Sequence, residues 1–407
     1  MRFLILTQYF PPEVGASQTR LLAVAQTLKG LGHDVRVVTG MPNYPDGGVK
    51  APYRGRVFLR EDRGGLPVTR VWLYPAKGIG WRRLANYLSF AATALFGLAR
   101  SPRPDVVYVE SPPLTLVPAG VLAARLWRVP IVMFVADPWP DSAVEVGALK
   151  PGRLLDAARR LERWAYRNVD GVLTPTRGLV EHLRAKGVGS HRLVFLPNGV
   201  DTALFAPRER DRDMANELGI EEDDRVVLYA GTVGRVHGVE VAVNAMSRLR
   251  ETHPRVRLLI VGAGSDLDAV RRLAAKLRLT NVSFVEPQSL ERLARTWTLA
   301  DVGLSTQRDL PVAEITRPVK IFAAMASGKA VAYSGSGEGA RLVQEADAGV
   351  VVPPEDPSAL ARAIAELVDD PERAAQLGTN GRRYVEDNLT WDCVVEDWIA
   401  QLERMRS

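Results

Sequence analysis

Short apolar runs alternate with longer amphipathic segments through the first half of the chain. Residues 16–29 form one such segment: apolar residues recur at helical spacing between Leu21 and Leu28, and Gly30 and Gly32 follow. This alternation favours a parallel sheet covered by helices. Strands are predicted at residues 3–7, 35–39, 68–73, 106–109, 131–135 and 171–174.

The same alternation restarts after a polar stretch at residues 208–224. It predicts strands at residues 226–229, 257–261, 282–285, 302–305, 330–333 and 350–352, with helices at 240–250, 266–277, 289–299, 319–326 and 339–346. The last stretch, residues 371–406, is helical by pattern, and its Trp391 and Trp398 need a surface to pack on.

Two sheets of this kind predict an α/β fold with two Rossmann-like, doubly wound domains that face each other across a cleft. The length of 407 residues agrees, because a single core seldom grows beyond roughly 250–300 residues. The predicted parts are residues 1–197, residues 198–385, and a terminal helix at 386–407 that crosses back to the first domain. The join lies near Pro197 to Asp201.

Charge and cysteine content indicate the cellular compartment in which the protein works. The net charge is +6, and the single cysteine, Cys393, forbids an internal disulfide, which suits a reducing compartment. The opening residues lack the features of a signal peptide, and no stretch reaches the roughly 18–20 apolar residues of a spanning helix. We therefore expect a cytoplasmic protein.

One basic and aromatic span indicates a place on a membrane surface. No acidic residue occurs between Asp62 and Asp105, and an apolar helical run at 84–98 follows Trp81, Arg82 and Arg83. The span resembles a helix lying on an anionic bilayer, which predicts contact with the cytoplasmic face of the inner membrane. A buried helix with basic ends is the alternative. We expect no nucleic acid partner, because no recognition motif accompanies the charge.

Loops after predicted strands supply candidates for phosphate contact. Gly15 lies between the first strand and the first helix, where it either lets backbone approach a phosphate or merely shapes a turn. Gly231, Gly234 and Arg235 follow the first strand of the second half, and suit a pyrophosphate held by amides and a cation. A flexible loop with a solvated arginine is the alternative. The run 261–264 lacks the third glycine of a dinucleotide fingerprint and is interpreted as a tight turn.

Charged residues at two other points complete the candidate site. Arg317 and Lys320 open a helix, where a cation opposes the helix dipole unless an anion binds there; a solvated lysine is the alternative. Asp137 follows a strand and is placed to meet sugar hydroxyls, while Asp141 caps the next helix. We assign no metal to the Asp-X-Asp pairs at 211–213 and 266–268, and the five histidines form no ligand cluster.

These motifs together resemble glycosyltransferase family 4, which has the GT-B fold. The matching pieces are YFPPEVGASQTR, LPNGVD, AGTVGRVHG, LLIVGAGSD and RPVKIFAAMASGKAV, and DPWPDSAVEVGALK resembles a subgroup that builds bacterial O-antigen, capsule or exopolysaccharide with fucosamine-type sugars. The resemblance implies a retaining, metal-free and cofactor-free transfer of a hexosyl or N-acetylhexosaminyl group. The donor would be a nucleoside diphosphate sugar, preferably of UDP, and the acceptor a lipid-linked saccharide.

The resemblance also assigns roles. It makes residues 1–197 the acceptor side and residues 198–385 the donor domain. Gly15 and Lys320 fall at positions near the donor phosphates, and Asp137 falls about where many members carry a histidine that touches the donor sugar. Catalysis is expected from Asp137, Lys320 and Arg235.

The sequence departs from the family at two points. Thr232 and His237 stand where many members have arginine and lysine. The usual pair of glutamates eight positions apart is missing, with Ala323 at the later position, Ile315 at the earlier one, and Glu314 one residue away as a substitute in donor binding. Two alternatives therefore stand beside the transferase: a nucleotide-sugar 2-epimerase of the same fold, and an inactive protein that binds a sugar nucleotide or a membrane.

Overall fold

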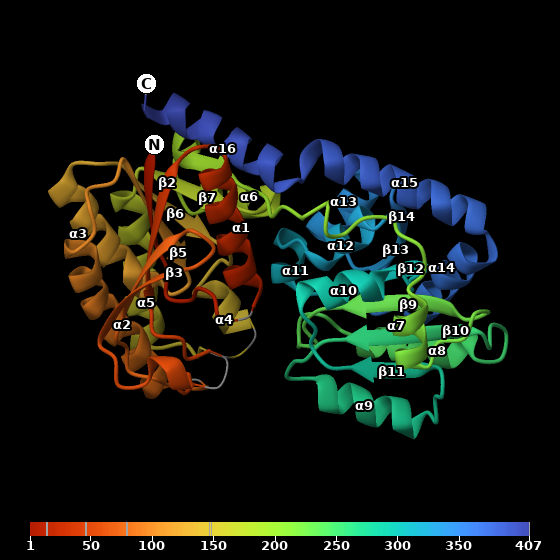
Figure 1. The fold of residues 1–407 in the computed structure, drawn as a ribbon. Helices are drawn as coiled ribbons and strands as arrows, with labels where there is room; N and C mark the ends of the chain where they lie inside the picture. Colours follow the sequence, from red (N-terminus) through yellow and green to blue (C-terminus); the bar gives the residue numbers. More distant parts are fainter. Residues whose placement is uncertain (14, 45–46, 79, 146, 148, 407) are drawn as a thin grey trace. The chain divides into compact units, whose positions relative to one another are not determined.

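The computed structural model describes residues 1–13, 15–44, 47–78, 80–145, 147 and 149–406. The chain forms two compact units, shown in Figure 1. The first unit is Met1–Pro197 together with the chain from Val394 onward, and the second is Asn198–Cys393.

The first unit is built on an eight-stranded sheet with the order β3-β4-β2-β1-β5-β6-β7-β8. Its strands are β1 (Arg2–Leu6), β2 (Asp34–Gly40), β3 (Phe58–Asp62), β4 (Pro67–Val71), β5 (Val106–Ser111), β6 (Ile131–Val135), β7 (Gly171–Thr174) and β8 (Leu193–Phe195). Neighbouring strands are parallel, as predicted, except that β3 pairs with β4 in the antiparallel direction. The sequence pattern missed the two edge strands, because β3 is charged and half exposed and β8 has three residues.

Helices cover both faces of this sheet (Figure 1). They are α1 (Ala16–Gly30), α2 (Trp81–Ala99), α3 (Val117–Trp127), α4 (Asp141–Glu145), α5 (Arg153–Asn168) and α6 (Arg177–Ala185). Gly97 of α2 lies against Val38 and Val71, and a side chain at Gly120 of α3 would meet Val109, so α2 and α3 share one face. On the other face, Arg20 of α1 lies 3.6 Å from the ring centroid of Phe134.

The second unit has a six-stranded sheet, parallel throughout, with the order β11-β10-β9-β12-β13-β14. Its strands are β9 (Arg225–Ala230), β10 (Val256–Val261), β11 (Val282–Val285), β12 (Val302–Thr306), β13 (Ala330–Ser334) and β14 (Gly349–Val352). All six were predicted. The order reverses between β9 and β12, and ligands of doubly wound sheets bind at the carboxyl ends of strands beside such a reversal.

Nine helices of the described chain lie entirely within the second unit. They are α7 (Arg212–Leu218), α8 (Glu240–Leu249), α9 (Leu267–Lys276), α10 (Leu290–Trp297), α11 (Pro311–Ile315), α12 (Lys320–Ala326), α13 (Gly337–Glu345), α14 (Pro357–Asp369) and α15 (Pro371–Asn388). The sequence pattern missed α7. Asp211 caps this helix by accepting from the Met214 amide at 2.9 Å and also pairs with Arg295, so this Asp-X-Asp pair has a structural role.

The last helix, α16 (Trp391–Arg406), starts in the second unit and continues in the first. The chain passes back at Val394 rather than at residue 386, because α15 packs within the second unit. A Cβ atom on Gly378 of α15 would lie 2.1 Å from the Gly328 carbonyl oxygen, so this helix lies directly on the turn after α12. In the first unit, the Trp398 ring lies 5.6 Å from that of Phe3 and 5.7 Å from that of Tyr108.

Candidate functional site

Glycines hold two neighbouring loops of the second unit together at the carboxyl ends of β9 and β10. The Gly231 amide donates to the Val261 carbonyl and the Val233 amide to the Ala263 carbonyl, both at 2.9 Å. A Cβ atom on Gly262 would lie 2.0 Å from the Gly231 oxygen, and one on Gly264 would lie 2.0 Å from the Val233 oxygen. The run 261–264, interpreted from sequence as a tight turn, thus also positions the loop after β9.

Lys320 is the centre of this site. Its Nζ donates to the Tyr229 hydroxyl at 2.8 Å, lies 4.3 Å from the centroid of that ring, and is 3.4 Å from Nδ1 of His237. The hydroxyl of Tyr229 in turn donates to the Thr232 carbonyl at 2.6 Å. Gly231 lies beside the lysine, because a Cβ atom there would be 3.0 Å from the Lys320 Cε. The structure therefore brings Lys320 and Gly231 together, two of the residues that the sequence analysis assigned to donor binding.

The electrostatics of this cluster favour an incoming anion. Burial lowers the pKa of Lys320 to about 7. Burial and then the nearby Lys320 charge lower the pKa of His237 to about 3, so His237 is neutral at physiological pH. Within the described residues Lys320 has no carboxylate partner at ion-pair distance. A diphosphate would supply the missing counter-charge and stabilise the protonated amine.

The other predicted residues of the loop after β9 are less constrained. Arg235 has an exposed side chain at the end of the loop. A Cβ atom on Gly234 would make only ordinary contacts, at 3.6 Å to Thr232 and 3.7 Å to Ser265. No steric reason for glycine is therefore found at position 234.

Arg317 is not the free cation that the sequence suggested. It forms a buried ion pair with Glu338 at 2.8 Å, with exposed side-chain fractions of 8% and 3%. Glu338 lies in the first turn of α13, where a carboxylate is favourable to the helix dipole. The pair ties the segment before α12 to the start of α13, so Arg317 positions this part of the site instead of standing open to a phosphate.

Glu314 lies at the junction of α11 and α13. It is exposed, and Gly337 packs against its backbone so closely that a Cβ atom there would be 2.4 Å from the Glu314 Cα. The side chain of Ser336, the N-cap residue of α13, makes no capping hydrogen bond, and the first amides of a helix lack partners within the helix. Glu314 therefore borders a helix start of the kind that attracts anions.

In the first unit, a buried carboxylate shapes the loop that carries Gly15. Glu13 accepts hydrogen bonds from the amides of Phe10 at 3.3 Å, Asn43 at 2.8 Å and Tyr44 at 2.7 Å. Gly15 precedes α1 in an extended conformation, and a Cβ atom there would meet only the flexible end of Gln18. Packing within this unit therefore gives no reason for glycine at position 15.

Asp137 follows β6 with an exposed side chain, and its charge helps to raise the pKa of Glu110, after burial as the larger cause. Glu110 forms a buried ion pair with Arg20 at 2.5 Å. Sequence reasoning missed this pair and Tyr229, and it noted His237 only as a departure from the family. The available signals were a charged residue inside the apolar strand VVYVES and an arginine on the apolar side of a helix.

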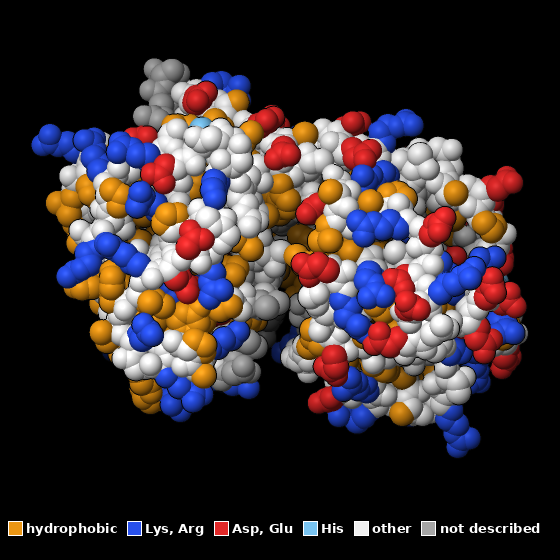
Figure 2. Space-filling model, in the orientation of Figure 1, with side chains coloured by type: hydrophobic (Ala, Val, Ile, Leu, Met, Phe, Trp, Pro, Cys, Tyr) orange, Lys and Arg blue, Asp and Glu red, His pale blue; other side chains and the backbone are white. Residues whose placement is uncertain are grey.

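The predicted membrane residues divide into two groups. Trp81 is 73% exposed and Arg82 is exposed, whereas Arg83 turns toward the protein, where its Nε donates to the Tyr87 hydroxyl at 2.9 Å. The outer side of α2 and α3 exposes further apolar residues: Leu84, Leu88, Leu95, Phe96, Leu122 and Leu126. Figure 2 shows hydrophobic and cationic side chains mixed on this side of the first unit. None of the described helices is long and apolar enough to span a bilayer.

Comparisons with known proteins agree with the two-unit division. Residues 15–199 match the family described as glycosyl transferase 4-like domain, and residues 210–384 match glycosyl transferases group 1. The chain is 28% identical over 415 residues to WcaI of Escherichia coli, a glycosyl transferase assigned to colanic acid biosynthesis, covering 99% of this chain and 100% of that protein.

Two solved structures share the fold over nearly the whole chain. Sucrose-phosphate synthase of Thermosynechococcus elongatus has a TM-score of 0.75 at 21% identity and covers 99% of this chain and 98% of its own. HepE of Anabaena in complex with UDP-glucose has a TM-score of 0.75 at 18% identity, with coverage of 99% and 100%.

Proposed function

We propose that this chain, whose two halves match the families described as glycosyl transferase 4-like domain and glycosyl transferases group 1, is a family 4 glycosyltransferase that transfers a sugar from a nucleoside diphosphate sugar to a lipid-linked glycan acceptor. Its fold is GT-B, as the sequence predicted. The proposal includes UDP as the preferred donor base, retention of the anomeric configuration, and a role in cell-surface polysaccharide assembly. The assignment of the relative WcaI to colanic acid biosynthesis supports that role.

One observation carries the donor proposal. Lys320 is a poorly solvated cation at the carboxyl ends of the strands beside the reversal of strand order, held by Tyr229 and His237 with no carboxylate among its described partners. Such a group costs stability when it is charged, and the cost is offset when a ligand of opposite charge binds. A nucleoside diphosphate supplies that charge at the place where doubly wound sheets bind ligands.

The same geometry suggests how transfer is accelerated. As the bond between sugar and diphosphate breaks, negative charge grows on the leaving phosphate. A fixed cation in a dry site stabilises that charge far better than water does, and the hydrogen bond from Lys320 to Tyr229 keeps the amine in place before the reaction starts. Lys320 is therefore proposed as the main catalytic cation, with the exposed Arg235 as a second one. Asp137 and Gly15 keep the roles predicted from the sequence, contact with the sugar and with the phosphates.

The exposed apolar side of α2 and α3 supports a lipid-linked acceptor. Trp81, Leu88 and Leu126 are 73%, 52% and 75% exposed on the isolated chain, and Arg82 stands beside the first of them. Aromatic, aliphatic and cationic residues on one surface suit the boundary of an anionic bilayer. An enzyme held there would meet an acceptor that never leaves the membrane.

Replacement of Lys320 by alanine tests the donor proposal. We expect turnover to fall by roughly 10²–10³-fold, the usual effect of removing one group that stabilises a developing anion, and the affinity for UDP to fall in calorimetry. The exposed Lys276, at the end of α9, provides the matched control, and Lys276→Ala should change neither quantity. Circular dichroism checks the fold of both variants. Unchanged UDP affinity and turnover in Lys320→Ala would remove the lysine from the mechanism.

A further inference from the structure

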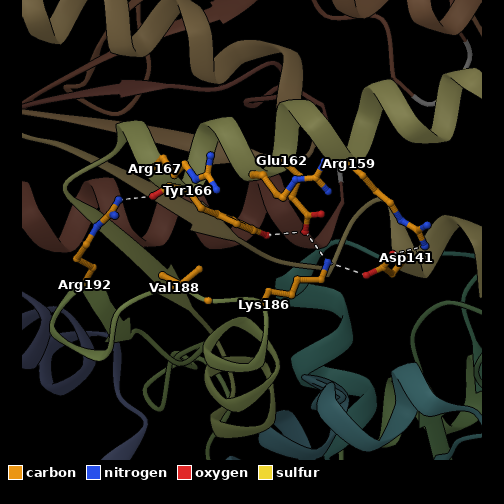
Figure 3. A pocket seen from close by; sticks show the side chains of 10 residues that line it. Asp141, Arg159, Glu162, Tyr166, Arg167, Lys186, Val188 and Arg192 are labelled. Carbon is orange, nitrogen blue, oxygen red and sulfur yellow. Dashed lines mark hydrogen bonds and ion pairs between the residues drawn. The ribbon is translucent and has the colours of Figure 1, made fainter.

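A cavity of about 390 Å³ lies in the first unit, between α5 and the turn that follows α6 (Figure 3). We call it the α5–α6 pocket. Five cationic side chains line it, and two carboxylates, those of Asp141 and Glu162, oppose them. The cations are Arg159, Arg163, Arg167, Lys186 and Arg192. The lining therefore has a net charge of +3, and the proposed donor site, in the other unit, makes no use of it.

Three of these cations lie on one side of α5. Arg159, Arg163 and Arg167 follow each other at intervals of four residues, a spacing that places their side chains in one row along a helix. Like charges at this spacing destabilise a helix. The row therefore costs stability unless another group neutralises it.

Both carboxylates of the pocket already have partners. The Lys186 Nζ lies 2.6 Å from Asp141 and 2.6 Å from Glu162, and the Tyr166 hydroxyl donates to Glu162 at 3.0 Å (Figure 3). Arg159 also contacts Asp141, at 3.2 Å. The acidic groups thus neutralise one end of the pocket only.

The other end keeps its positive charge. Within the described chain, neither Arg163 nor Arg167 has an ion pair or side-chain hydrogen bond, and both are exposed. Arg192 faces them from the opposite wall, where its guanidinium donates to the carbonyls of Tyr166 and Val169 and is held in place by them. Three guanidinium groups therefore line the cavity, and none of them is paired with a carboxylate of the described residues.

We propose that the α5–α6 pocket binds an anion that carries a phosphate group, with Arg163 and Arg167 as its principal ligands and Arg192 as a fixed third cation. Guanidinium groups bind phosphate through paired N–H donors, and arginine is favoured over lysine where such pairing matters. The volume lies in the range of small-molecule sites, so the pocket has room for a diphosphate or a phospholipid headgroup. A dianion also removes the repulsion along α5.

The test uses inorganic pyrophosphate and the full chain with Lys320→Ala, so that the proposed donor cation does not contribute. Calorimetry should show binding, and adding Arg163→Gln and Arg167→Gln should weaken it by roughly tenfold or more, the loss expected for charge-assisted contacts. Arg160→Gln is the matched control, because this arginine is exposed on the same helix outside the pocket. Hydrogen exchange should show protection of residues 159–167 and 186–192 by pyrophosphate.

A second arm separates the two sources of phosphate. Binding to vesicles of phosphatidylglycerol and phosphatidylcholine is compared with binding to phosphatidylcholine alone, again with and without the two glutamine substitutions. A loss confined to the anionic vesicles assigns the pocket to a lipid headgroup, whereas a loss confined to pyrophosphate assigns it to a soluble phosphate compound. If Arg160→Gln weakens binding as much as the pair, or if the pair changes neither ligand, the proposal is overturned. Because the donor site lies in the other unit, this outcome is independent of the fate of Lys320 as a catalytic group.

Discussion

At the scale of single residues, Lys320 combines two unfavourable features. It lies in the first turn of α12, where a cation opposes the helix dipole, and its amine is poorly solvated. Its contacts, Tyr229 and His237, offer a hydroxyl and a neutral ring but no negative charge. The loop after β9 carries Thr232 and His237, which supply no positive charge at neutral pH, so the cationic role falls on Lys320 and Arg235.

This environment predicts that donor binding takes up a proton. The pKa of Lys320 is about 7 in the free protein, and a bound diphosphate raises it. Above pH 7 the free amine is mostly neutral and must be protonated on binding, so UDP affinity should fall by about tenfold per pH unit from pH 7.5 to 9. Below pH 7 this group contributes no pH dependence. Calorimetry at pH 8 in two buffers of different ionisation enthalpy should detect uptake of roughly one proton.

The matched variant is Lys320→Arg, because a guanidinium stays charged throughout this range. It should bind UDP without proton uptake. His237 adds nothing to the effect, since its pKa of about 3 keeps it neutral across the window. Equal proton uptake in the wild type and in Lys320→Arg would show that another group is titrating.

A second prediction at this scale concerns Gly264. Its substitution by alanine would place a Cβ atom 2.0 Å from the Val233 oxygen and 2.8 Å from the Val233 nitrogen, both of which are backbone atoms that cannot swing away. We expect Gly264→Ala to reduce the free energy of unfolding by about 1–3 kcal/mol, the usual cost of overpacking, in urea denaturation. Gly234→Ala, whose Cβ atom would make only ordinary contacts, should change it by less than about 0.5 kcal/mol. Equal effects of the two would contradict the packing argument.

At the scale of elements, the hydrophobic pattern predicted all six strands of the second unit, its edge strands included, and missed the two edge strands of the first unit. β5 and β6 are buried over their whole length and have apolar sequences that signal a strand. β3, with the sequence FLRED, is half exposed and is fixed by pairing with β4, which a local pattern does not reveal. α7 was missed because polar residues surround it and its start depends on the Asp211 cap.

The same limit applies to the site. Gly231 and Lys320 could be identified from the sequence, because glycines and cations in loops cluster where the backbone approaches a phosphate. The partner of a charge is a property of tertiary structure. Nothing local to Arg317 shows that Glu338 neutralises it, and nothing local to Arg20 shows that it pairs with Glu110.

The α2 helix yields a prediction that separates its two arginines. Its outer side exposes Trp81 and Leu88, so Trp81→Ser and Leu88→Ser should each weaken binding to anionic vesicles by roughly tenfold, as expected for withdrawing a large apolar side chain from the bilayer. Arg82→Gln should weaken binding mainly at low salt, because an exposed charge is screened. Arg83 is unsuitable for this test, since its contact with Tyr87 belongs to the fold.

Leu290, 42% exposed on α10 of the second unit, provides the control for this measurement. Leu290→Ser removes a comparable side chain from a helix whose two arginines, Arg292 and Arg295, are paired with carboxylates. It should leave vesicle binding unchanged. If all the variants bind vesicles as the wild type does, α2 has no part in membrane association.

At the scale of the whole molecule, the first unit is completed only by a segment that follows the entire second unit in the sequence. The first unit is interrupted after Pro197 and receives its last helix only after the whole second unit, because the chain returns at Val394. Helix α16 has two tryptophans, and each of them packs against a different unit. Trp391 lies against Gly199 of the second unit, and Trp398 is buried against Phe3 and Tyr108 of the first.

The two tryptophans should therefore destabilise different units when they are replaced, although they share one helix. Removing the buried Trp398 should cost about 3–5 kcal/mol, because a cavity remains, and removing the half-buried Trp391 should cost less. With Trp398→Ala, hydrogen exchange should accelerate in β1 and β5 and leave β9 and β13 protected as before. With Trp391→Ala the acceleration should appear near residues 199–200 and 389–390, where the Val200 amide donates to the Leu389 carbonyl at 2.8 Å. Loss of protection in both units after either substitution would show instead that the two units unfold as one cooperative body, because each unit would then depend on contacts made by the other.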